Sequence, residues 1–209
     1  MEKMNFSTPI VLENDNVLLR PLEPTDVDHL LPFALNEPAI WKFSHPSPAG
    51  SPQALGQYIQ SALQERNAKT GYPFIVFDKR SNEYAGCTRF YEISFSNQSL
   101  QLGYTWYASK FCGTGLNKNC KLLLLDYAFG ILGMHRVEFR AHAQNERSIA
   151  AMKSIGCVAE GILRSHIPGP GGKRRDTIIL SILRTDWESG VRENLINKIE
   201  YGSISKKRY

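Results

Sequence analysis

The sequence predicts a mixed α+β fold: one twisted, mostly antiparallel sheet of about seven strands with helices on both faces. The main observation is the order of the expected elements: strand, two helices, three strands, helix, strand, helix and hairpin. This order fits neither an alternating βαβ array nor an all-β sandwich. A length of 209 residues, 42% of them hydrophobic, is also enough to bury a large core within one domain.

The first expected elements are a strand and two helices. Residues 17–20 form the strand, which a proline ends, and Thr25 or Asp26 is expected to cap the first helix. Ser51 caps the second helix, with Pro52 at its first position. Apolar side chains at helical spacing extend this second helix to about residue 68.

Three strands and an apolar helix follow. The strands are expected at residues 74–77, 84–95 and 100–107, with short polar turns between them. Such connections are typical of an antiparallel meander. The helix after them is expected to span about residues 115–132.

The next part of the chain is expected to hold a strand, a short helix and a hairpin. The strand covers residues 137–143, and Asn145 caps a helix that Gly156 ends in a left-handed conformation. The hairpin pairs residues 161–167 with residues 177–183 around a turn rich in proline and glycine.

A last helix and the domain limits complete the outline. Thr185 and Glu188 have the spacing of a capping box at the start of that helix. We expect an N-terminal extension at residues 1–16, one domain at 17–190 and a basic tail at 191–209.

Composition argues against several classes of protein. The net charge of +5 is mild, and three of the cations stand among the last four residues. The four cysteines show no C-x-x-C spacing, so no metal site is expected. Residues 1–9 lack an apolar signal core, and the apolar run at 122–125 is too short to cross a bilayer. These features predict a soluble, cytoplasmic protein with no membrane association.

The most informative segment joins a strand to the apolar helix through a loop that contains two glycines. Backbone N–H groups of such a loop and the positive end of the helix form an anion site, which pyrophosphate often occupies. Gly113 and Gly115 would let the backbone approach phosphates closely. The spacing matches neither a nucleotide P-loop nor a dinucleotide fingerprint, and a plain turn is the other interpretation. The residues of this candidate site are Lys110, Phe111, Cys112, Gly113, Thr114, Gly115, Leu116 and Asn117.

The loop and several flanking motifs resemble GNAT N-acetyltransferases, and specifically the RimJ/RimL-type branch that acetylates the N-termini of ribosomal proteins. The family loop is [RQ]-x-x-G-x-[GA], and here Lys110 takes its first place. The resemblance runs from about residue 17 to residue 187. It implies the GNAT acyl-CoA N-acyltransferase fold, with acetyl-CoA as co-substrate. The other matching segments are 102–106, 145–148, 155–157, 161–164 and 175–177.

The resemblance also implies roles for individual residues. Pantetheine would pair with the strand backbone at Trp106 and Tyr107, and the amine would attack the thioester directly in a ternary complex. Asn145 would reach the pantetheine arm, and Ser148 would protonate the departing thiolate. The alternatives are a pure helix cap for Asn145 and an ordinary serine in the first turn for Ser148.

The catalytic base is not evident from the resemblance. The branch often has glutamate before the Gly-Tyr step of the strand, where this chain has Gln101. A neutral amide cannot accept a proton at pH 7. Glu92, His142 and His166 are the candidates to act instead, and surface residues are the alternative interpretation of each.

The acceptor is expected to be an amine, either the N-terminus of a ribosomal protein or a small molecule. Residues 41–48 are a candidate lid, and several aromatic side chains either line an acceptor pocket or belong to the core. A CoA-binding protein without transferase activity and a ribosome- or RNA-binding protein are the rival functions, although the chain lacks an RNA-binding aromatic motif. A homodimer is compatible with the sequence. The aromatic residues are Trp41, Phe43, Phe90, Tyr91, Trp106 and Tyr107.

Overall fold

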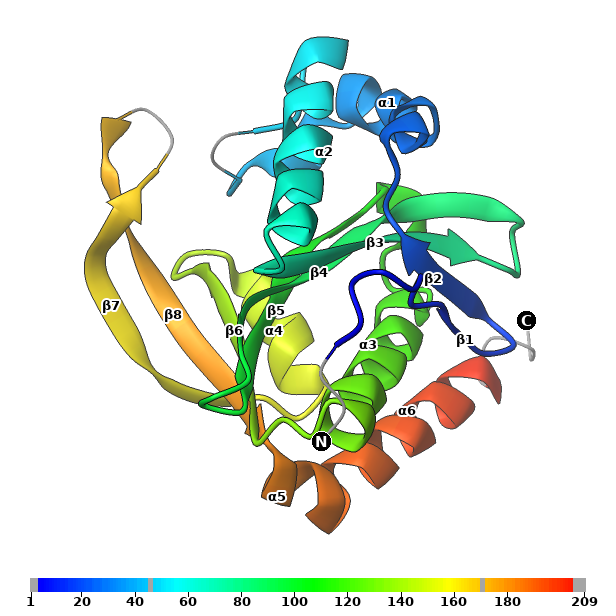
Figure 1. Cartoon of the computed structure of the whole chain (residues 1–209), viewed down its shortest axis with the longest axis vertical. Helices are drawn as coiled ribbons and strands as arrows, with labels where there is room; N and C mark the ends of the chain where they lie inside the picture. Colours follow the sequence, from blue (N-terminus) through cyan, green and yellow to red (C-terminus); the bar gives the residue numbers. More distant parts are fainter. Residues whose placement is uncertain (1–3, 45–46, 170–171, 205–209) are drawn as a thin grey trace.

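The computed structural model describes residues 4–44, 47–169 and 172–204. Eight strands form one sheet in the order β1-β2-β3-β4-β5-β6-β8-β7, in which only the β5–β6 pair is parallel (Figure 1). The strands are β1 (Leu12–Glu13), β2 (Val17–Pro21), β3 (Gly71–Asp78), β4 (Glu83–Ser94), β5 (Ser99–Tyr107), β6 (Arg136–His142), β7 (Val158–Pro168) and β8 (Arg174–Leu183). The helices are α1 (Val27–Asn36), α2 (Pro52–Asn67), α3 (Leu116–Asp126), α4 (Glu146–Ser154), α5 (Arg184–Asp186) and α6 (Arg192–Ile204).

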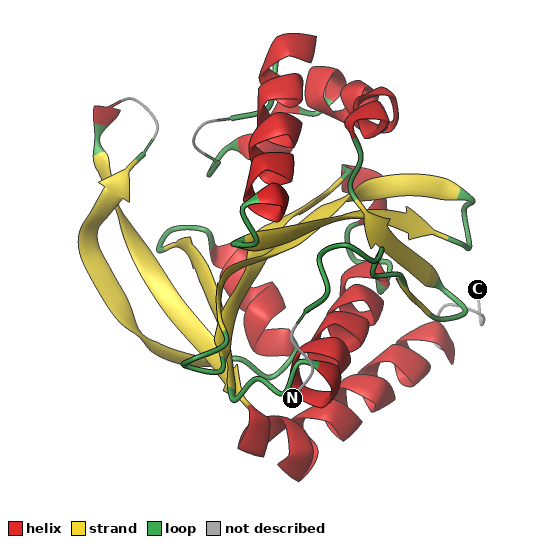
Figure 2. Cartoon of the chain, viewed as in Figure 1, coloured by secondary structure: helices red, strands yellow, loops and turns green. Residues whose placement is uncertain are grey.

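Helices lie on both faces of the sheet, as the sequence predicts (Figure 2). On one side, which we call the α1–α2 face, Leu30 and Leu55 pack in a core with Trp106. On the opposite side, the α3 face, Leu116 and Leu195 belong to the larger core. Because side chains alternate along a strand, each strand of the sheet contributes to both faces.

The strand β6 shows this alternation clearly. Val137 and Phe139 are buried in the larger core, whereas the residues that alternate with them, Arg136, Glu138 and Arg140, are only partly buried. The polar side chains of β6 therefore lie on the α1–α2 face.

Several predicted bounds change in the structure. The sheet has an eighth strand, the two-residue β1, and the strand expected at 74–77 is the longer β3. The helix expected at 115–132 is α3 up to Asp126, followed by the π-helical turn η4 (Tyr127–Ile131). Gly156 has φ +102°, as expected for a left-handed residue after a helix.

The expected caps are confirmed at two helices. At the first helix Asp26 occupies the expected cap position but makes no side-chain cap to α1, and at the last helix the expectation is wrong. The Ser51 hydroxyl accepts a hydrogen bond from the Ala54 N–H at 3.1 Å, and Asn145 likewise caps α4. At the first helix, by contrast, Asp26 accepts from the Glu23 N–H at 2.8 Å, one turn earlier than expected. The C-terminal capping box is wrong, because the chain becomes helical at residue 184 and the Asp186 carboxylate accepts from the backbone of the preceding strand.

Candidate active site

The strands β5 and β6 separate partway along their length. They pair only where Ser99–Gln101 of β5 lies beside Arg136–Glu138 of β6. Beyond these three positions, β5 stays paired with β4 and β6 stays paired with β8. The inner backbone edges of the two strands are therefore left without a strand partner, and we call this opening the split. Unpaired strand edges can hydrogen-bond a ligand that lies between them.

Trp106 and Tyr107 lie on the β5 side of the split, as predicted. Their side chains are buried on opposite faces of the sheet, 8% and 9% exposed. Only their backbone can therefore serve a ligand in the split, which is the role that the resemblance implies. Trp41 and Phe90 are also buried core residues, so four of the six aromatic candidates belong to the core.

A β-bulge lies in β5 beside the split. The pairs Cys87–Trp106 and Arg89–Gly103 enclose one residue on β4 but two residues on β5. Tyr104, inside this bulge, has φ +49°. An extra residue in a strand is left without a ladder partner. The bulge therefore adds a backbone donor next to the split.

The glycine loop follows β5 directly and leads into α3. Gly113 has φ +74°, and Gly115, the residue before α3, has φ +94°. A Cβ built on either glycine meets no atom within 4 Å. The loop therefore leaves open space at both glycines and fits a ligand that approaches the backbone closely. The Thr114 hydroxyl stabilises the loop by donating to the Phe111 carbonyl at 2.8 Å.

Several amides of the loop are bonded within it. The N–H groups of Cys112 and Thr114 each donate to the carbonyl three residues earlier, at 3.0 and 3.4 Å. The Leu116 N–H donates to the Thr114 hydroxyl at 3.3 Å. A phosphate on these amides would have to share or replace the internal bonds. The first turn of α3, which contains Asn117, supplies the helix end whose N–H groups favour an anion.

The cations near the loop have different partners. Lys110 pairs with Glu83 at 2.6 Å, which neutralises part of its charge. Arg147 of α4 hydrogen-bonds the Cys112 sulfur and has no carboxylate partner among the described residues. The sequence alone did not place Arg147 at this loop, because α4 and the loop are far apart in the chain.

Asn145 and Ser148 lie where the chain leaves β6 and enters α4. The Asn145 Oδ1 accepts from the Ser148 N–H at 3.1 Å, so the asparagine caps α4. The half-buried Ser148 stands in the first turn of that helix. Both residues thus follow the strand that forms the other side of the split.

The three candidate bases lie on three different strands. Glu92 is exposed, with φ +48°, at an irregularity of β4. His142 ends β6 and packs against Phe43, with ring centroids 5.1 Å apart. His166 shares a 3.1 Å hydrogen bond with Thr177 and belongs to β7, which β8 separates from β6. The structure does not gather these residues into one cluster.

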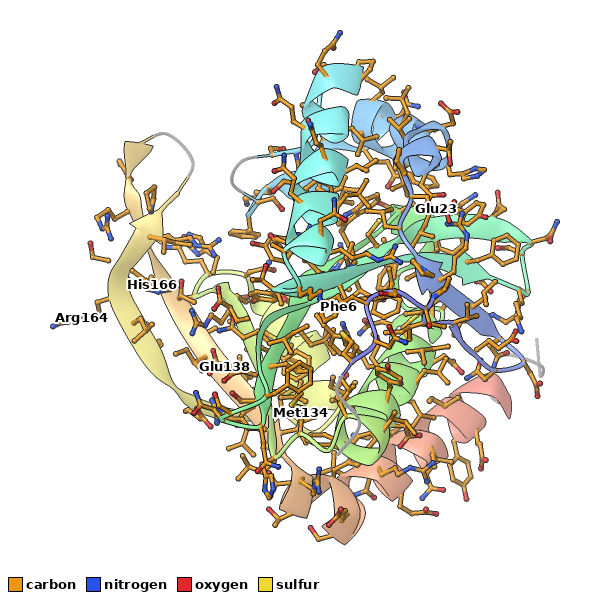
Figure 3. The ribbon with its side chains drawn as sticks, in the orientation of Figure 1. Phe6, Glu23, Met134, Glu138, Arg164 and His166 are labelled. Atoms are coloured by element: carbon orange, nitrogen blue, oxygen red, sulfur yellow. The ribbon has the colours of Figure 1, made fainter. Side chains whose placement is uncertain are left out.

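Sequence reasoning missed Glu138, the residue of β6 that pairs directly with Gln101 (Figure 3). Its carboxylate, 15% exposed, accepts from Arg140 at 2.7 Å and from Arg136 at 2.9 Å. Gln101 beside it is buried, and its Oε1 has no hydrogen-bond partner among the described residues. The alternation of apolar and charged residues in this strand was the signal that could have identified Glu138.

A buried lysine lies on the α3 face of the same strands. Lys121 Nζ donates to the Thr105 hydroxyl at 2.8 Å and to the Thr88 hydroxyl at 3.2 Å. No carboxylate pairs with it among the described residues, and burial lowers its pKa to about 8. The network ties α3 to the bulged segment of β5.

Two other kinds of site were sought in the described part of the chain. It holds no group of histidine, cysteine, aspartate or glutamate side chains that could bind a metal ion. Among its helices, none combines the length and the apolar character that crossing a membrane requires.

Comparisons with known proteins agree with this geometry. The family model described as "Acetyltransferase (GNAT) domain" matches residues 16–158. A Bacillus subtilis protein named "Putative ribosomal N-acetyltransferase YdaF" is 26% identical, over 84% of this chain and 95% of its own.

Solved structures show the same fold. A GCN5-related N-acetyltransferase from Brucella melitensis has a TM-score of 0.83 at 23% identity, over 91% of this chain and 85% of that one. Mycobacterium smegmatis RimJ, solved with CoA-disulfide, has a TM-score of 0.72 at 19% identity, over 90% and 93% of the two chains.

Proposed function

The chain belongs to the GNAT acetyltransferase family, and from this membership we propose that it transfers an acetyl group from acetyl-CoA to a primary amine in a ternary complex. The observation that carries the proposal is the split between β5 and β6, which opens beside a glycine loop at the start of α3. The split would offer strand backbone to pantetheine, and the glycine loop with the start of α3 would offer a helix end to pyrophosphate.

The cofactor would lie across both elements. The first turn of α3 and the open positions at Gly113 and Gly115 would hold the pyrophosphate, with Arg147 as the nearby cation. The backbone of Trp106 and Tyr107 would hold the pantetheine arm, and Asn145 would contact it from the start of α4. Acetyl-CoA supplies an activated thioester, which an amine can attack without a covalent enzyme intermediate.

The chain's own residues supply three further functions. A backbone N–H of the β5 bulge stabilises the negative charge that develops on the thioester oxygen. Ser148 donates a proton to the leaving thiolate. Glu138 takes the proton of the amine through water, because it is the carboxylate beside Gln101 at the closed end of the split. Glu92 and His166 are the competing candidates for this last role.

The acceptor is proposed to be the amine of a protein N-terminus or of a small molecule. The relative named as a ribosomal N-acetyltransferase supports the first. The protein is proposed to act in the cytoplasm.

An acetyl-transfer screen tests this function. The protein is incubated with acetyl-CoA and a panel of N-terminal peptides and small amines, and released thiol is measured. Acceptor-dependent thiol release together with an acetylated product supports the proposal. Tight binding of CoA without transfer to any amine would instead identify a CoA-binding protein, a function for which the uncharged Gln101 is the specific argument.

A further inference from the structure

Arg175, on the α1–α2 face, is a cation without a carboxylate partner in the described part of the chain. It stands on β8 two residues before Thr177, which pairs with His142 at the end of β6. Its Nη1 donates to the Phe43 carbonyl at 3.1 Å, while its Nε is buried and lacks a partner among the described residues. Burial lowers the pKa of its guanidinium. A partly desolvated guanidinium that has no carboxylate partner favours an anion at this position.

Two neighbouring arginines of the same face differ from Arg175 in having carboxylate partners. Arg89 pairs with Glu65 at 2.8 Å, and Arg140 pairs with Glu138 at 2.7 Å. No described carboxylate forms such a pair with Arg175. Of these three arginines, Arg175 is therefore the one without a carboxylate partner among the described residues. Lys42, whose Nζ lies 5.4 Å from the centroid of the Phe43 ring, adds a second cation beside it that also lacks a described carboxylate partner.

Two tyrosines lie within electrostatic range of Arg175, and as neutral phenols they carry no charge to offset it. They are Tyr91 and Tyr104, whose rings meet edge to face with centroids 5.0 Å apart. Tyr104 is 49% exposed, and its phenol can donate a hydrogen bond to an anion. Tyr91 pairs directly with Gln101. The unpaired arginine thus lies in the same neighbourhood as the closed end of the split.

We propose that Arg175 binds a carboxylate on the acceptor, so that the enzyme selects amines that also carry a carboxylate. This inference rests on the proposed acetyl transfer and specifies its substrate class. The guanidinium would pair with the carboxylate, and the Tyr104 hydroxyl would add a second donor. The carboxylate would belong either to an acidic side chain next to a peptide N-terminus or to a free amino acid.

Amines with a second positive charge fit this face poorly. The Glu65 and Glu138 carboxylates are already bound by arginine, so they offer little to a second ammonium group, and Arg175 would repel it. A neutral acceptor would leave the arginine without a partner. An acceptor with a carboxylate removes both penalties.

Matched acceptors test the inference. The amide of the peptide Ser-Asp-Ala is compared with that of Ser-Asn-Ala, and serine is compared with serinamide, by kcat/KM from thiol release. A charge-assisted hydrogen bond contributes about 1.5–3 kcal/mol, which predicts a preference of roughly 10- to 150-fold for the charged member. The pair that shows the preference identifies the source of the carboxylate. Equal kcat/KM values within both pairs would overturn the inference.

Variants assign the preference to a residue. In Arg175→Gln the ratio of kcat/KM between charged and neutral acceptors should fall to about one, and Arg175→Lys should retain part of it. Arg164→Gln is the matched control, because Arg164 is an exposed arginine of the same hairpin that points away from the rest of the molecule (Figure 3). A purely structural role of Arg175 would lower both rates and leave the ratio unchanged, which would contradict the proposal.

A binding measurement separates this inference from the proposed function. The probes are the N-acetylated forms of both peptide amides and N-acetylserine with its amide, titrated calorimetrically into the protein saturated with CoA. Tighter binding of a carboxylate-bearing probe that is lost in Arg175→Gln supports the anion site even where no amine is acetylated. Acetylation without any carboxylate preference refutes the anion site and leaves the transferase function intact.

Discussion

Gln101 and Glu138 are cross-strand neighbours in the last pair that joins β5 to β6 before the two strands separate. One is a buried amide whose oxygen has no partner among the described residues, and the other is a carboxylate held by two arginines. A carboxylate is thus present beside the expected position, on the adjacent strand β6 rather than on β5. Under the proposed mechanism, the base differs from the expected pattern in its position and not in its presence.

The pH dependence of acetylation should identify the base. Glu138→Gln should lower kcat/KM by roughly 10²- to 10⁴-fold and remove the acidic limb of the pH profile, as for the loss of an acid–base group. Glu160→Gln is the control, because it also deprives Arg136 of a partner but lies on β7. A profile that follows the pKa of each acceptor would show that no protein base operates. A larger loss in Glu92→Gln or His166→Gln would assign the base to that residue.

The reverse change at Gln101 gives a second test of the same pair. Gln101→Glu places a second carboxylate beside Glu138, and like charges raise the pKa of one member of such a pair. The acidic limb of kcat/KM should therefore move to higher pH. An unmoved limb, with unchanged folding by circular dichroism, would separate Glu138 from the rate-determining proton transfer.

The glycine loop should tolerate no side chain where phosphates approach. Gly113→Val should weaken acetyl-CoA binding by at least about tenfold, an effect on the order of 1.4 kcal/mol. Gly172→Val is the matched control, since Gly172 has φ +75° against +74° for Gly113 and a Cβ built at either position meets no atom within 4 Å. Both variants carry the same backbone strain. Calorimetry that shows equal cofactor affinity for the two would remove Gly113 from the site.

Loss of the Ser148 hydroxyl should affect turnover more than binding. The Ser148→Ala variant keeps the backbone N–H that Asn145 accepts, so α4 keeps its cap. Turnover should fall by roughly 10- to 10⁴-fold, while the affinity for acetyl-CoA changes little. Asn145→Ala should instead weaken the helix by about 1 kcal/mol. Turnover of Ser148→Ala within twofold of the parent would exclude the hydroxyl as the acid.

Lys121 should destabilise the fold near neutral pH. Burial lowers its pKa from 10.5 to about 8, so the folded protein binds fewer protons than the unfolded chain between these values. Stability should therefore rise with pH across this window, and below pH 8 the full cost of roughly 3 kcal/mol remains. Lys121→Met should raise the free energy of unfolding at pH 7, less so at pH 10. Urea titrations at both pH values that show no difference would contradict the assignment.

Cysteine alkylation should report cofactor binding. Cys112 is half-buried in the glycine loop, whereas burial raises the pKa of Cys120 and of Cys157 to about 12. Iodoacetamide should therefore modify Cys112 first, because the thiolate is the reactive form. Saturating CoA should slow this modification. Peptide mass mapping that finds equal rates with and without CoA would place the cofactor elsewhere.

Much of the fold could be predicted because its signals are local. The Ser-Pro start of α2, the Asn145 cap and the left-handed Gly156 each depend on a few consecutive residues. The caps at the first and last helices show the limit of such signals. In both, a carboxylate accepts from the N–H three residues before it, Asp26 from Glu23 and Asp186 from Leu183, so the helical turn begins earlier than the pattern suggested. β1 was missed because two residues carry no periodicity.

The site was less predictable, because it is assembled from distant segments. The glycine loop is contiguous, and its glycines adopt the positive φ angles that the pattern suggested. Glu138 could be recognised only once β6 was placed beside β5. Arg175 required the contact with Phe43, which spans 132 positions of the chain.

The split divides the sheet into two sets of paired strands, which we call plates. One plate contains β1 to β5 and the other contains β6 to β8, and three pairs of residues join them at the closed end like a hinge. The Arg175–Phe43 bond joins the β6–β8 plate to the chain segment between α1 and α2, so it is a second connection between the two halves. The larger core, which includes residues of both plates, also packs across the split on the α3 face. An acceptor whose carboxylate engages Arg175, as proposed, would therefore bind at a contact that spans both halves of the sheet.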